Sequence, residues 1–96
     1  MVTSRHDNSE HAEVIALKAL GFLASDPERM ERFMALSGLT VEAIRRDAAK
    51  PAFLGGLLDH ILADQTLLMM FAESEGIAPG SIESLRRRLP GAPRDF

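Results

Sequence analysis

Residues that start or stop helices recur at short intervals along this chain of 96 residues, and they limit what it can fold into. Asp26-Pro27 can cap and open a helix, Gly38 can end it in a left-handed conformation, and Pro51 can open another. Asp64 and Gly76 repeat the cap and the stop further along the chain. No segment alternates β-branched and polar residues as a strand would. The sequence therefore predicts an all-α fold, a single compact bundle of five or six short helices.

The expected helices differ in how apolar they are. Residues 14–24 and 67–72 are apolar on almost every side, so the helices that contain them are predicted to be central. The helix that opens at Pro51 is expected to close the core, and the one after Pro27 is expected to be amphipathic. The remaining boundaries are a capping box at 7–10 for the first helix, Thr40 as the cap of the third, an end at Ser74 for the fifth, and a start near Pro79 for the sixth.

An internal repeat emerges when the chain is shifted by 38 positions (76 minus 38) against itself. Each unit would contain a long helix, an Asp-capped second helix, a glycine stop and a third helix. Two interpretations stay open, a duplicated three-helix unit or two similar helical hairpins of separate origin. Phe33 and Phe71 occupy matching sites and are predicted to point into the core. The identical pairs are Leu20 with Leu58, Asp26 with Asp64, Phe33 with Phe71, Gly38 with Gly76, and Ile44 with Ile82.

The helix signals also define the domain organisation. Residues 9–90 are expected to form a single helical domain. Residues 1–8 are predicted to be a flexible N-terminus and residues 91–96 a flexible C-terminal tail.

Composition excludes several classes of function. The chain has 11 basic and 14 acidic residues, a net charge of −3, and no cysteine. Acidic chains have no general attraction to nucleic acid or anionic membranes, and lack of cysteine excludes disulfides and thiolate chemistry. Residues 1–7 lack the apolar stretch of a secretory signal, and no apolar run approaches the ~18 residues that span a bilayer. We therefore expect a cytoplasmic protein with no membrane partner.

Several stretches of the chain, which together cover roughly residues 10–91, resemble a family of small bacterial all-helical proteins, a domain of unknown function. The resemblance implies the fold class and a bacterial source, but it supplies no activity and no functional residues. Ala78 stands where many such sequences have an acidic cap before the last helix. The stretches are Ala16–Ala24, Asp26–Arg29, Phe33, Ser37–Leu39, Pro51–Leu54 and Leu89–Gly91.

No catalytic or metal-binding constellation stands out. His60 adjoins Asp59 and lies one turn before Asp64, a pairing that could serve as a general base or a metal ligand. A metal needs three or four converging ligands, and a histidine in the last helical turn is favoured by the helix dipole alone. A structural role is therefore the preferred interpretation for His60. None of the serines stands in a nucleophile elbow, so we expect no enzymatic activity, no cofactor and no metal.

DNA binding is the alternative function. The helix at 65–74, the turn at Gly76 and the helix from Pro79 fit a helix-turn-helix pattern, and Arg86, Arg87 and Arg88 could contact phosphates. The face that would meet the bases carries no Arg, Lys, Asn or Gln to read base edges. Nucleic acid is therefore not the expected partner.

The preferred function is a small helical protein-interaction or regulatory module without catalytic activity, which acts as a monomer or weak homodimer on an unidentified protein partner. The candidate partner-binding residues are Gly55, Gly56, Arg86, Arg87 and Arg88. A glycine pair inside a helix costs roughly 1 kcal/mol per residue against alanine. It therefore indicates either close packing of another element or an open notch. The methionines at 30, 34, 69 and 70 could line a hydrophobic groove or fill the core.

Overall fold

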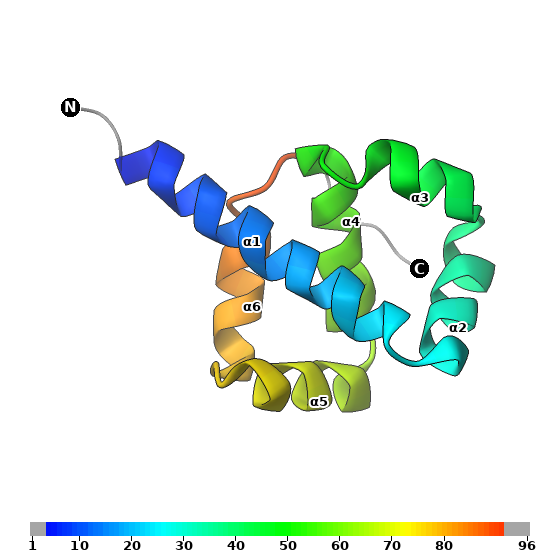
Figure 1. The fold of residues 1–96 in the computed structure, drawn as a ribbon. Coiled ribbons are helices and arrows are strands. Elements are labelled where there is room, and N and C mark those ends of the chain that lie inside the picture. The colour runs from blue at the N-terminus through cyan, green and yellow to red at the C-terminus, as the bar shows by residue number, and fades with distance from the viewer. Residues whose placement is uncertain (1–3, 92–96) are drawn as a thin grey trace.

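The computed structural model of the protein describes the backbone of residues 4–91 and the side chains of residues 9–91. This range contains six α-helices and no strand (Figure 1), which confirms the predicted all-α fold. None of these helices is both long and apolar enough to cross a membrane. The helices are α1 (Ser4–Ala24), α2 (Pro27–Ser37), α3 (Val41–Asp47), α4 (Pro51–Leu62), α5 (Gln65–Glu75) and α6 (Pro79–Arg86).

Most helix boundaries follow the predicted capping residues. The side chains of Asp26, Thr40 and Asp64 each accept a hydrogen bond from a backbone N–H in the following turn, at 3.0, 3.1 and 3.2 Å. Gly38 and Gly76 end α2 and α5 with φ angles of 76° and 70°, the left-handed region that glycine enters without steric cost. These five residues fix where the chain changes direction.

The first helix departs from its prediction. It begins at Ser4, so the capping box expected at residues 7–10 is wrong because these residues lie inside α1. Of the flexible ends expected at 1–8 and 91–96, residues 4–8 belong to α1, whereas residues 1–3 and 92–96 lie outside those that the structure describes. Flexibility of the two ends stays a prediction.

Helix α4 forms the centre of the bundle. It packs against α1, α5 and α6, and α1 crosses in front of it in Figure 1. Its residues 54–61 are buried without interruption. In contrast, Val14 and Leu17 of α1 are 48% and 46% exposed, and Met69 and Met70 of α5 are 47% and 40% exposed. The sequence predicts that the first and fifth helices are central and that the fourth closes the core. Helix α1 does pack against α2, α4 and α6, whereas α5 is less enclosed than α4, because an apolar segment need not be enclosed on all sides.

The core collects one inner face from every helix. Phe33 and Phe71 are 1% and 0% exposed, which confirms their predicted inward orientation. The ring of Phe71 packs against that of Phe22, with 5.4 Å between centroids. On α1, the inward residues at 12, 16 and 19 are alanines, so this helix can approach α4 closely.

The two predicted repeat units share their caps but differ in packing. Helix α6 packs against both α4 and α5, whereas α3 makes no comparably close contact with any described helix. The first helix has 21 residues and its counterpart, α4, has 12. A common origin of the two units stays a prediction.

Candidate functional site

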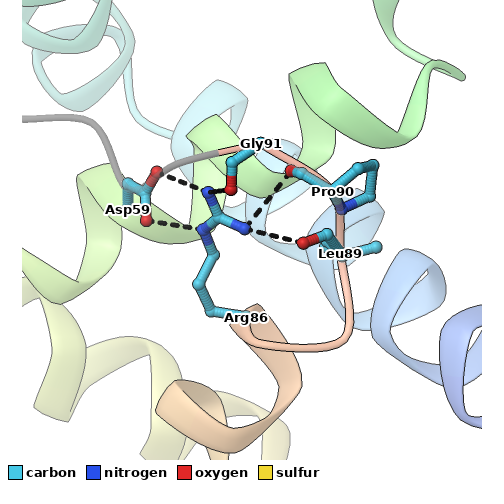
Figure 2. Close-up of polar contacts among 5 residues, drawn as sticks. All are labelled: Asp59, Arg86, Leu89, Pro90 and Gly91. Atoms are coloured by element: carbon cyan, nitrogen blue, oxygen red, sulfur yellow. Dashed lines mark hydrogen bonds and ion pairs between the residues drawn. The ribbon is translucent and has the colours of Figure 1, made fainter.

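A buried ion pair joins α4 to α6. The Nε of Arg86 donates to Oδ1 of Asp59 at 2.6 Å, and its Nη2 donates to Oδ2 at 3.2 Å (Figure 2). The two side chains are only 7% and 4% exposed. A buried charge is costly unless it is paired and its remaining hydrogen-bonding groups are satisfied, so the other contacts of this guanidinium matter.

The guanidinium also holds the segment that follows α6. Nη1 donates to the carbonyl oxygens of Leu89 and Pro90 at 3.0 and 3.4 Å, and Nη2 donates to that of Gly91 at 3.0 Å (Figure 2). The five hydrogen bonds match the five N–H donors of arginine. We call this set, Asp59 with Arg86 and the carbonyls of 89–91, the Arg86 clasp.

Gly55 makes room for the clasp. A Cβ atom on Gly55 would lie 3.0 Å from Nη1 of Arg86 and 3.1 Å from the carbonyl oxygen of Pro90. Gly56, the next residue on α4, is buried as well. Of the two interpretations of the glycine pair, close packing therefore holds at Gly55, and its neighbours are the Arg86 side chain at the end of α6 and the carbonyl oxygen of Pro90.

The five predicted partner-binding residues fall into two groups. Gly55, Gly56 and Arg86 are buried, so none of the three offers an open notch at the surface, and partner binding by them stays a prediction. Arg87 and Arg88 are exposed. Arg87 lies 3.8 Å from the carboxylate of Glu83, and Arg88, just after α6, donates to the backbone carbonyl of Ser84. A role for these two in partner binding stays a prediction.

A surface cleft lies between α2 and the start of α5. It consists of two adjoining hollows of about 330 and 150 Å³ that share Arg32, His60 and Asp64. We call it the α2–α5 cleft. Its other lining residues are Arg29, Leu36, Ala63, Gln65, Thr66, Leu67 and Met70.

His60 lines both hollows, and its side chain is almost wholly covered. The residue is 3% exposed, and its ring meets that of Phe33 edge-on, with 4.9 Å between centroids. The pKa of His60 is lowered, mainly because burial disfavours the imidazolium and further because Arg32 is positive, while Asp64 acts in the opposite direction. His60 is therefore neutral at pH 7. Among residues 9–91, no three His, Asp or Glu side chains converge as a metal site.

The two arginines of the cleft differ in their surroundings. The guanidinium of Arg29 lies 4.3 Å above the ring of Phe22 and 3.8 Å from the carboxylate of Asp26. Arg32, one turn later on α2, is exposed and forms no ion pair with any described side chain. Sequence reasoning missed this pair, although their spacing of three residues places both on one face of α2.

Over residues 4–91 the chain is thus a six-helix, all-α domain with a buried arginine clasp and a cleft at its surface. It belongs to the family described as "Protein of unknown function (DUF3572)", which matches residues 9–92. This match confirms the resemblance to a family of all-helical proteins of unknown function. No curated protein and no solved structure matches the chain.

Gly55→Ala is expected to destabilise the protein by about 1–3 kcal/mol, because the added methyl group presses on an arginine held by five hydrogen bonds. Gly21→Ala is the matched control, since Gly21 is helical and nothing lies within 4 Å of its Cβ position. That change should stabilise by about 0.5–1 kcal/mol. Urea unfolding of both variants measures the two free energies. Equal stabilisation by both would show that Gly55 is not required by the clasp.

Stability should also fall as the pH drops below about 6.5, the ordinary pKa of histidine, because the unfolded chain binds a proton that folded His60 resists. Urea unfolding at pH 7.5 and 5.5 measures this slope. His60→Gln should flatten it, whereas His11→Gln, a change at an exposed histidine of α1, should leave it intact. If the stability of the His60→Gln variant still fell between pH 7.5 and 5.5, the pH dependence could not be assigned to His60.

Proposed function

We propose that this protein is a small helical interaction module without catalytic activity, and that the α2–α5 cleft binds a protein partner. The observation that carries the proposal is the pairing of apolar and charged groups around this cleft. Leu36 and Met70 line it while 47% and 40% exposed, and Arg32 lies between the two hollows without an ion pair among the described side chains. Exposed apolar groups next to a positioned charge are typical of surfaces that dock proteins.

The contacts of the candidate catalytic groups support the non-catalytic part of the proposal. Asp59, the carboxylate next to His60 in sequence, is bound to Arg86. The hydroxyls of Ser25 and Ser74 donate to backbone carbonyls one turn earlier. These groups have structural hydrogen bonds that catalysis would have to break.

The DNA-binding alternative gains no support from the helices it would use. Arg86, one of its three candidate phosphate contacts, is buried in the clasp. Arg87 and Arg88 are exposed on an otherwise acidic molecule, next to Glu83. Few phosphates could then be neutralised, and phosphate neutralisation provides most non-specific affinity for DNA. A protein partner, a cytoplasmic location, a bacterial source and a monomer or weak homodimer stay predictions.

Cross-linking affinity purification from cells of the source organism tests the proposal. Wild-type protein should retain a discrete set of proteins, and Arg32→Glu and Leu36→Glu should each lose at least nine-tenths of it. The matched controls are Arg45→Glu and Val41→Glu on α3, since Val41 is as exposed as Leu36, at 47%. Retention that is the same in all four variants, or absent in wild type, would contradict a binding role for the cleft.

A further inference from the structure

The positive charge of the α2–α5 cleft comes from two arginines on one helix. Arg32 is exposed where the hollows join and has no carboxylate partner among the described side chains. Arg29 lines the smaller hollow, and the nearest ion-pair distance to it is 3.8 Å, from Asp26. This is long for a charge-assisted hydrogen bond, which is typically about 2.7–2.9 Å. Both guanidinium groups therefore keep donors for a bound anion.

The acidic residue of the cleft is already engaged. Oδ1 of Asp64 accepts the backbone N–H of Leu67 at 3.2 Å, as the N-cap of α5. A carboxylate in this position is compensated by the positive end of the helix dipole. His60 adds no positive charge, because burial and Arg32 keep it neutral. The charge left for recognition is that of the arginines.

The apolar residues that line the α2–α5 cleft favour a peptide over a small anion as its ligand. Leu36 lines the larger hollow and Met70 the smaller one, and Leu67 is half-buried beside Met70. A free anion would bind the arginines but leave these side chains in water. The larger hollow, at about 330 Å³, is at the lower limit of sizes that enclose a small-molecule ligand. Its size and openness suit side chains that project from a docked segment.

Resting on the proposed docking role of the cleft, we infer that its ligand is an acidic, apolar segment of a partner protein. A carboxylate of that segment binds Arg32, with Arg29 in reach. Its leucine-like side chains cover Leu36 and Met70. The charge of the cleft and the apolar residues on either side of it thus select the same class of partner.

NMR titration of the isotope-labelled full chain tests this with a defined probe. The probe is the acetylated, amidated peptide Glu-Leu-Leu-Glu-Glu-Leu-Leu-Glu, and its counterpart has glutamine at every glutamate. The acidic peptide should shift the signals of Arg32, Leu36, Gln65 and Met70, with at least ten-fold higher affinity than the glutamine peptide. Raising the salt concentration should reduce that ratio, because exposed charges are screened.

Two exposed arginines supply the matched variants. Arg32→Gln should abolish the preference for the acidic peptide, whereas Arg45→Gln on α3 should retain it. Both side chains lie at the surface, so neither change should affect folding, and the spectra of the free variants verify this. Loss of the preference in both variants would overturn the assignment to Arg32.

The possible failures are distinguishable from those of the proposed function. Equal affinity for the two peptides at the cleft would overturn the acidic preference and leave the cleft as a docking surface. NMR signal shifts confined to residues outside the cleft, or no signal shifts at millimolar peptide, would overturn the inference. The cross-linking experiment would still test the proposed function separately. Shifts of the cleft signals with protein concentration alone would identify a second copy of this chain as the occupant, which also contradicts the inference.

Discussion

The ion pair between Asp59 and Arg86 is the contact on which the rest of this small fold depends. It joins the central helix α4 to α6, and through three backbone carbonyls it also holds residues 89–91 against the bundle (Figure 2). Two charges at this depth would each cost several kcal/mol if unpaired. The bundle is therefore constrained to an arrangement in which α4 presents Asp59 to α6 and Gly55, one turn earlier, leaves room for the guanidinium.

The same helix connects the clasp to the cleft. Asp59 and His60 are consecutive in α4, so their side chains point about 100° apart around the helix axis. One meets α6, and the other meets Phe33 of α2 and lines the α2–α5 cleft. Because the clasp fixes the rotation of α4, it also fixes the position of His60 in the cleft that Arg32 lines. The geometry of the proposed binding surface is in this sense set from a neighbouring face of the same helix.

The features that could be predicted from the sequence are those that depend on contacts within one helical turn. The caps at Asp26 and Asp64 and the stops at Gly38 and Gly76 depend on neighbouring backbone groups, so local chemistry is sufficient to identify them. Which helix is most enclosed depends on how the helices meet, and the apolar pattern of the chain did not single out α4. The clasp joins Asp59 to a residue 27 positions further along the chain. No rule of sequence spacing indicates which of the three consecutive arginines, 86, 87 or 88, is its partner. A signal did exist, because Arg86 is four residues after Ile82 and three before Leu89, both buried, so it shares their face of the chain.

A double-mutant cycle of urea unfolding on Asp59 and Arg86 tests the central claim most directly. Asp59→Leu and Arg86→Met should each cost about 3–5 kcal/mol, because each leaves one buried charge without its partner. The double variant, which buries no charge, should be more stable than either single variant, and it should fold even where a single variant does not. Small costs that simply add, as expected for the exposed pair of Arg87 and Glu83, would show that the clasp does not organise this fold.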